Sequence, residues 1–307
     1  FEIYNILSDE ENTLNLSQID DYQKLPEIRD KLLNYREKRV HPRKDNKILT
    51  DWNGMIAAAL ARAGYVFGES GYIELARGVV DFLFDKMFEK EDNKLFHSFC
   101  EGQRSSNILL NDYSYLLWSL IELHQSTLDS IYLDKAKIIA ESMINFFWND
   151  DKGVFYLNME KEIDIPVNQV NAYDGVYPSA NSLAAWNFIR FAHLFDLIEY
   201  ENKAKKIINY FSSKIKEKPI AYTFLLKSVI LEQHSFNKLS IYCRENDEFC
   251  INIKEKLKKI YLPNYVVMKS ERSNKRDSAI ICKNFCCGIP LRDVDDIIKK
   301  IIKKNQK

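Results

Sequence analysis

The sequence lacks any long apolar run and has no excess of charge of either sign. No stretch approaches the roughly 20 uncharged apolar residues that span a bilayer, and no basic and then apolar signal peptide opens the chain. The 44 basic and 44 acidic residues cancel, so no overall field attracts nucleic acid or an anionic membrane. We therefore expect a cytoplasmic protein with no nucleic-acid partner and no membrane partner.

Several catalytic motifs are also absent. The sequence contains no glycine-rich phosphate loop, no His-Glu-x-x-His pair and no Gly-x-Ser-x-Gly elbow. The six cysteines do not form the even framework of a secreted domain, so reduced thiols are expected. Cys282, Cys286 and Cys287 crowd near the C-terminus without a second ligand pair or a nearby histidine. No metal site and no cofactor are predicted.

What the chain does contain is a recurring pair of helices. Residues 51–67 are rich in alanine and apolar on nearly all sides, which is typical of a helix enclosed by others. Inner and outer helices of three pairs are predicted at residues 51–67 and 70–87, 111–125 and 132–148, and 181–197 and 203–215. Short segments of strand character, 94–99 and 153–157, precede the second and third inner helices.

Hairpins of this kind that pack side by side place the starts of all inner helices at one end, as in an (α/α) toroid. With helices at 25–39 and 220–233, about eight are predicted, against about twelve in a ring of six hairpins, so the toroid is expected to be incomplete at its N-terminal side. The last 70 or so residues alternate strand-like and helical segments. The predicted domains are therefore a mainly α toroid portion, 1–236, and a small α/β extension, 237–307.

The first polar cluster lies at the start of the first inner helix, in Asp51-Trp52-Asn53-Gly54. The indole of Trp52 is suited to stacking on a sugar, while polar side chains from this cluster and the preceding loop bind its hydroxyl groups. These polar residues are Arg43, Asp45, Asp51 and Asn53. The alternative is that Asp51 simply caps the helix after an ion-paired loop.

Two further clusters precede the other inner helices. Asp112, followed by Tyr113, is a carboxylate whose pKa would rise if it were shielded, and it is therefore a candidate general acid or base. Asp174, Ser179 and Asn181 offer polar groups in a loop that is typical of a binding site. Helix capping is the alternative role in both clusters.

These motifs carry a resemblance to a known family. The matching motifs are Arg36-x-x-Arg39-x-x-Pro42-x-x-Asp45-x-Lys47-Ile48-Leu49-x-x-Trp52-Asn53-Gly54, Asp112-Tyr113, Asp174-x-x-x-Pro178-Ser179-x-Asn181-Ser182 and Cys282-x-x-x-x-Cys287-x-x-Pro290. Together they resemble the thioredoxin-domain-containing, spermatogenesis-associated protein 20 family. The resemblance implies a toroid similar to N-acylglucosamine 2-epimerases and six-hairpin glycosidases, preceded by a thioredoxin-like domain. That domain and the first hairpins have no counterpart in this chain, which begins at Phe1.

Two hypotheses about function follow from the resemblance. In the first, the chain is the C-terminal part of a carbohydrate-active-like toroid that binds a sugar or polyol in a central cleft. Asp112 would be the acid-base group of an epimerase, isomerase or glycosidase-like reaction. The substrate-binding residues would be Arg43, Asp45, Asp51, Trp52, Asn53, Tyr113, Asp174, Ser179 and Asn181.

In the second hypothesis, the toroid is a non-catalytic docking or client-binding module. It would work with a thioredoxin-like domain or with the missing N-terminal half, and the loop motifs would be chiefly structural. The role of Cys282 and Cys287 is open, and this hypothesis predicts that their loss affects stability or redox coupling rather than sugar binding.

Overall fold

The computed structural model describes residues 25–159, 168–244, 247–270 and 277–305, so Phe1 lies outside the described part. The chain divides into two compact units, Phe1–Asn46 and Lys47–Lys307. In the first unit, helix α1 (Leu25–Arg36) forms as predicted, with Pro26 in its first turn, and it ends three residues earlier than expected. It buries none of its residues.

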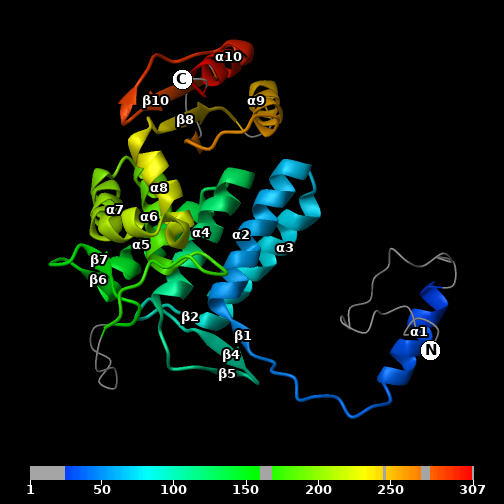
Figure 1. The fold of residues 1–307 in the computed structure, drawn as a ribbon. Coiled ribbons are helices and arrows are strands. Elements are labelled where there is room, and N and C mark those ends of the chain that lie inside the picture. The colour runs from blue at the N-terminus through cyan, green and yellow to red at the C-terminus, as the bar shows by residue number, and fades with distance from the viewer. Residues whose placement is uncertain (1–24, 160–167, 245–246, 271–276, 306–307) are drawn as a thin grey trace. The chain divides into compact units, whose positions relative to one another are not determined.

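The second unit contains the predicted helical hairpins (Figure 1). The described hairpin helices are α2 (Thr50–Phe67), α3 (Ser70–Phe82), α4 (Leu110–Thr127), α5 (Ile131–Phe147), α6 (Ala180–Phe195) and α7 (Ile198–Glu217). A π-helical turn, Leu83–Met87, continues α3, and a 3-10 turn, Pro219–Tyr222, leads into α8 (Thr223–Gln233). The predicted mainly α toroid is confirmed.

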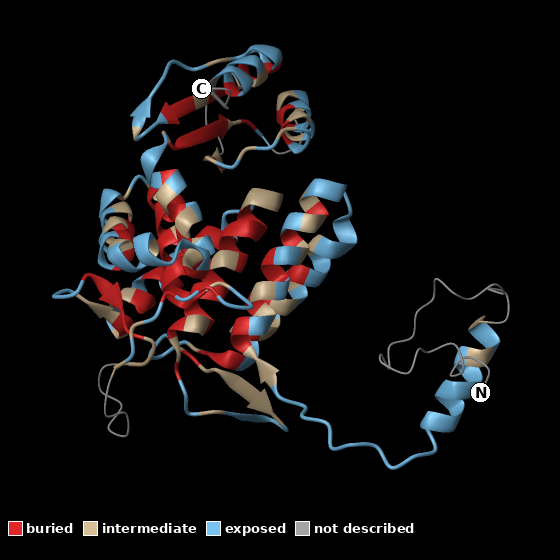
Figure 2. Cartoon of the chain, in the orientation of Figure 1, coloured by how far each residue is buried: buried red, intermediate tan, exposed pale blue. Residues whose placement is uncertain are grey.

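The inner helices α2, α4, α6 and α8 pack in chain order, and α3, α5 and α7 pack outside them. Figure 2 shows the buried residues gathered along α4 and α6, whose neighbours cover them on most sides. Gly54 allows the close approach of α2 and α4, since a Cβ atom there would lie 2.9 Å from the Tyr115 carbonyl carbon. Within the described part of the chain, α2 and α8 make no extensive contact, so these helices form an arc.

Short strands link the hairpins. The described pairings are β1 (Ile48–Leu49) with β4 (Ser98–Cys100), β4 with β5 (Gln103–Arg104), β2 (Phe88–Glu89) with β3 (Lys94–Leu95), and β6 (Trp148–Asn149) with β7 (Val154–Phe155). The segment of strand character predicted at 94–99 divides between two sheets, into β3 and the start of β4. Phe96 and His97 lie between the two strands, and their carbonyl groups bind Thr50. The Thr50 hydroxyl donates to the Phe96 carbonyl at 2.6 Å, and the Thr50 amide donates to the His97 carbonyl at 2.9 Å.

The C-terminal part has its own sheet and its own apolar cluster. Its strands are β8 (Asn237–Tyr242), β9 (Tyr265–Ser270), β10 (Ser278–Lys283) and β11 (Cys286–Cys287), in the order β11-β10-β8-β9. Only β8 and β9 run parallel among these pairs, because α9 (Glu248–Lys258) provides the crossover between them. Helix α10 (Val294–Asn305) packs against α9. The predicted domain boundary between residues 236 and 237 stays a prediction.

Cys282 and Cys287 form a disulfide, so the expectation of reduced thiols is wrong for this pair. The antiparallel register of β10 and β11 places the two residues directly opposite each other, which brings their sulfur atoms together. The remaining cysteines, Cys100, Cys243, Cys250 and Cys286, are free thiols.

Specific polar contacts hold the C-terminal sheet against the inner helices. The Gln125 side chain donates to the Val267 carbonyl at 2.9 Å and accepts from the Val267 amide at 2.8 Å. The His193 ring stacks between the rings of Phe236 and Phe285. His193 of α6 is therefore held by aromatic side chains that follow and precede strands of this sheet. None of the helices in the described segments combines the length and apolarity needed to cross a bilayer.

Candidate functional site

The first candidate site is the Asp-His cluster, formed by Asp51, His97 and Asp112. Asp51 and Asp112 lie in the first turns of α2 and α4, and His97 lies between β3 and β4. The Oδ1 atom of Asp112 accepts from the Asp51 amide at 3.1 Å and lies 3.0 Å from His97 Nδ1. The structure therefore brings together two of the predicted residues and adds His97.

Burial controls the protonation of this cluster. Loss of solvation raises the pKa of Asp112 to about 6, and it also raises the pKa of Asp51. The hydrogen bond to Asp112 raises the pKa of His97. Asp112 is completely buried, whereas 23% of the His97 side chain is exposed. A solute can therefore reach His97, and the hydrogen bond to Asp112 orients the His97 ring.

Among the described residues, the same cluster is a group of side chains that could hold a metal ion. One donor atom from each of Asp51, His97 and Asp112 lies within 4.8 Å of the others. However, Asp112 already contacts His97 through both carboxylate oxygens, at 3.0 and 3.2 Å. The Asp112 carboxylate and His97 Nδ1 are therefore engaged with each other, and a metal bound to these atoms would have to replace their contacts.

Two of the predicted binding residues hold loops in place. The Tyr113 hydroxyl accepts from the Leu95 amide at 2.7 Å and donates to the Asn93 carbonyl at 3.0 Å. The Asn181 side chain accepts from the Phe155 amide at 3.1 Å and donates to the Phe155 carbonyl at 3.0 Å. Both side chains are completely buried, so their contacts fix the β2–β3 hairpin to the start of α4 and strand β7 to the start of α6.

Asp174 and Ser179 act at helix starts. The Asp174 carboxylate accepts from the amides of Ser179 at 2.8 Å, Phe224 at 2.8 Å and Leu225 at 3.0 Å. The Ser179 hydroxyl accepts from the Ser182 amide and caps α6. Asp174 thus joins the loop before α6 to the first turn of α8.

The remaining predicted residues are more exposed. Trp52 is 57% exposed, and the Asn53 amide group donates to the Leu49 carbonyl at 2.7 Å. Arg43 and Asp45 are exposed and belong to the other compact unit, Phe1–Asn46. Their predicted contact with a substrate stays a prediction.

A second candidate site is the inner-helix pocket, a cavity of about 510 Å³. All four inner helices and the segment 260–267 contribute to its lining. Its polar and aromatic lining residues are Arg62, Tyr65, Phe67, Trp118, Glu122, Gln125, Ser126, Trp186, Arg190, Lys227, Tyr261 and Tyr265. None of the binding residues predicted from the sequence lines this pocket.

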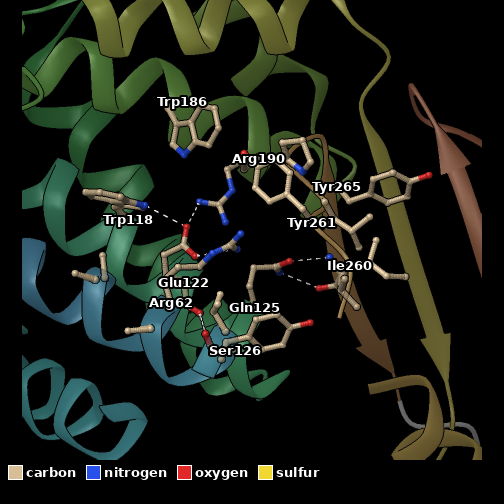
Figure 3. Close-up of a pocket in the computed structure, with 18 of the residues that line it drawn as sticks. Arg62, Trp118, Glu122, Gln125, Ser126, Trp186, Arg190, Ile260, Tyr261 and Tyr265 are labelled. Atoms are coloured by element: carbon tan, nitrogen blue, oxygen red, sulfur yellow. Dashed lines mark hydrogen bonds and ion pairs between the residues drawn. The ribbon is translucent and has the colours of Figure 1, made fainter. Parts of the chain in front are cut away.

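Glu122 is the centre of the pocket's polar network (Figure 3). Its Oε1 atom accepts from Arg190 Nη1 at 2.6 Å and from Trp118 Nε1 at 3.2 Å. Its Oε2 atom is buried and has no hydrogen-bond partner, and it forms a long ion pair with Arg62, whose Nη1 atom is 4.0 Å away. One carboxylate oxygen therefore remains able to accept a hydrogen bond.

Lys227 lies among aromatic rings in the same pocket. Its ammonium nitrogen is 4.4 Å from the ring centre of Trp186 and 4.2 Å from that of Phe224. Burial lowers the pKa of Lys227, and the neighbouring Arg190 lowers it further.

The spacing of residues on the inner helices could have indicated the pocket. The sites predicted from the sequence came from the loop motifs instead. Trp118 and Glu122, and likewise Trp186 and Arg190, are four residues apart and share a face of an inner helix. A charged residue on a helix that is enclosed by others needs a buried partner. Glu122 and Arg190 are each other's partner, 68 positions apart in sequence.

Helical hairpins whose inner helices start at one end define the (α/α) toroid class. Over 298 residues the chain is 24% identical to human spermatogenesis-associated protein 20, which confirms the resemblance seen in the motifs. This alignment covers 88% of the chain but only 38% of that relative. No family model matches the chain.

Solved structures support the same fold class. A GH76 α-mannanase from Bacteroides thetaiotaomicron aligns with a TM-score of 0.51 and 14% identity, over 76% of this chain and 66% of the mannanase. A cellobiose 2-epimerase from Bacillus thermoamylovorans aligns with a TM-score of 0.48 and 15% identity, over 57% of this chain and 47% of the epimerase. The mannanase alignment establishes the fold and nothing further.

Proposed function

We propose that this chain binds a sugar or polyol in the inner-helix pocket. The observation that carries the proposal is the presence of Trp118 and Trp186 beside the Glu122–Arg190 pair in one cavity. Indole rings pack against the apolar faces of sugar rings, and a few fixed polar groups orient the hydroxyl groups. The volume of about 510 Å³ is also suitable, because small-molecule pockets range from about 300 to 1,000 Å³.

Glu122 is the hydrogen-bond acceptor that we assign to a ligand hydroxyl. Its Oε2 atom has no hydrogen-bond partner, whereas both polar groups of the Gln125 side chain are hydrogen-bonded to the backbone of Val267. A buried acceptor without a partner costs about 1–3 kcal/mol, which a ligand hydroxyl would recover. Glu122 is also the only carboxylate among the residues that line the pocket.

Sugar epimerisation or isomerisation is the reaction class that we propose with this binding function. Such reactions move a proton, which requires a carboxylate or imidazole within reach of the substrate. Glu122 meets this requirement for a ligand in the pocket. Asp112, the acid-base residue predicted from the sequence, is buried and would act through the partly exposed His97. Neither residue lines the inner-helix pocket, so this pair would act on a ligand bound elsewhere. The cytoplasmic location remains part of the proposal.

Alanine substitution of the tryptophans tests the binding function. Trp118→Ala and Trp186→Ala should each weaken binding of a monosaccharide or polyol from a screened panel by about tenfold or more. Trp148→Ala is the matched control, because Trp148 packs on Phe155 and does not line the pocket. Equal losses in all three variants, or no loss in the pocket variants, would contradict the proposal.

The second candidate function is docking to a thioredoxin-like partner, and it is favoured by the exposure of Cys287. Cys282 is buried, so Cys287 presents the disulfide sulfur that an incoming thiolate can attack. A thioredoxin trapping variant should form a mixed disulfide at Cys287 that mass spectrometry identifies. Cys286→Ser is the control for the neighbouring free thiol. Failure to trap Cys287 in this variant would count against docking.

A further inference from the structure

The inner-helix pocket contains more positive than negative charge. Its lining includes three cationic side chains, Arg62, Arg190 and Lys227, and one carboxylate, Glu122. Three positive charges minus one negative charge leave a formal excess of two. The whole chain is neutral, so this excess is a local property of the pocket.

The excess charge is concentrated on two of the three cations. Arg190 is paired with Glu122 at 2.6 Å, and both side chains are at least nine-tenths buried. Arg62 lies 4.0 Å from the same carboxylate and is nearly half exposed, so its charge is only weakly compensated. Lys227 has no carboxylate partner among the described residues, and its nearest partners are aromatic rings.

The environment of Lys227 would favour a bound anion. Burial and the two neighbouring arginines disfavour its charged form, whereas Glu122, already paired with Arg190, favours that form. An anion placed beside Lys227 would add an opposite charge in a partly dehydrated site, where attraction is stronger than in water. The pocket is therefore electrostatically complementary to a negatively charged ligand.

We propose that the ligand of the inner-helix pocket is an anionic sugar, bearing a phosphate or a carboxylate, whose charged group binds Lys227 and Arg62. The proposal rests on the proposed sugar-binding function and specifies its substrate class. The sugar ring would pack against the indoles, and one hydroxyl would donate to Glu122 Oε2. Lys227 is the residue that determines specificity for the charged group.

Calorimetry with four probes tests this assignment on the full protein. The probes are glucose, glucose 6-phosphate, glucuronate and inorganic phosphate. At low salt, glucose 6-phosphate or glucuronate should bind at least about tenfold more tightly than glucose, and added salt should reduce this difference. The anionic sugar that binds more tightly identifies whether phosphate or carboxylate is the preferred group.

Matched lysine variants separate charge recognition from general effects. Lys227→Met should reduce the ratio of anionic-sugar affinity to glucose affinity, both measured in the same variant, from at least about tenfold to about one. Lys203→Met is the control, because Lys203 also lies over an indole, that of Trp148, and its pKa is also lowered by burial. This control variant should keep the preference.

The outcomes distinguish this inference from the function on which it rests. Glucose binding as tightly as both anionic sugars would overturn the inference and leave sugar binding intact. Inorganic phosphate binding as tightly as glucose 6-phosphate would also overturn it, since the pocket would then recognise an anion alone. Absence of binding by all three sugars would overturn the proposed function itself.

Discussion

The starts of the inner helices and the inner-helix pocket differ in how completely their polar groups are used. At the starts of the inner helices, Asp174 accepts three backbone hydrogen bonds and Asn181 makes three more. In the inner-helix pocket, one oxygen of Glu122 has no hydrogen-bond partner, and Lys227 forms no ion pair with a carboxylate among the described residues. The contrast indicates that most of the loop motifs organise the fold, whereas the pocket retains groups that a ligand can use.

The largest effect should come from removing the charge at the centre of the pocket. Glu122→Gln leaves Arg190 buried without a counter-charge, which should lower the free energy of unfolding by about 3 kcal/mol. Urea denaturation measures this change. Glu232→Gln is the control, because Glu232 is about one-third exposed and lies 4.0 Å from Lys205, and it should cost less than about 1 kcal/mol. If Glu122→Gln cost as little stability as the control, the buried Glu122–Arg190 pair would not differ from an exposed ion pair.

Asp174→Asn, at the starts of the inner helices, should lower the free energy of unfolding by a smaller amount, about 2 kcal/mol. An asparagine has one oxygen for three amide donors, so its amino group would oppose at least one of them. Thermal denaturation, with Asp150→Asn as the control, measures the loss. Asp150 is exposed and accepts only from the Trp148 indole among the hydrogen bonds described. Unchanged stability in Asp174→Asn would show that this loop is not structural.

The regular elements were predictable because they depend on local sequence. The alanine-rich stretch of α2 and the periodic apolar residues of α4 and α6 predicted their helices, with bounds within one or two residues for most of them. The division of the strand at 94–99 was not predictable. It depends on hydrogen bonds from Thr50, more than forty positions earlier in the chain.

The candidate sites depended even more on contacts between distant residues. Asp51 and Asp112 were chosen from the sequence, but the proximity of His97 to both needed the three-dimensional structure. The pocket joins residues of four helices, and a tryptophan inside an apolar helix is more often part of a core than of a binding site. Periodicity alone could not distinguish Trp118 from its buried neighbours.

The Asp-His cluster should make stability depend on pH. The folded-state pKa of Asp112, about 6, exceeds the ordinary value of 3.8, and that of His97 is raised above 6.5. Both groups therefore stabilise the fold most at low pH, and this contribution declines as the pH rises through about 6 and then through the pKa of His97. NMR titration should show the pKa of His97 falling in Asp112→Asn. A constant value in the variant would mean that Asp112 does not control His97.

The smallest effect should follow from Trp52→Ala. Trp52 is 57% exposed, so its loss should change the free energy of unfolding by no more than about 0.5 kcal/mol. Sugar binding should also be unchanged, in contrast to Trp118→Ala. Calorimetry on the two variants makes the comparison. A greater loss of binding in Trp52→Ala would return the sugar site to the starts of the inner helices.

The four tryptophans provide the most direct test of where a sugar binds. Trp118 and Trp186 line the inner-helix pocket, Trp52 lies at the start of α2, and Trp148 lies in β6. Each indole N–H gives a separate NMR signal that can be followed during titration with the tightest-binding sugar. We predict concentration-dependent shifts for Trp118 and Trp186, with Trp52 and Trp148 unchanged. Shifts of Trp52 without shifts of Trp118 and Trp186 would contradict the assignment of the pocket.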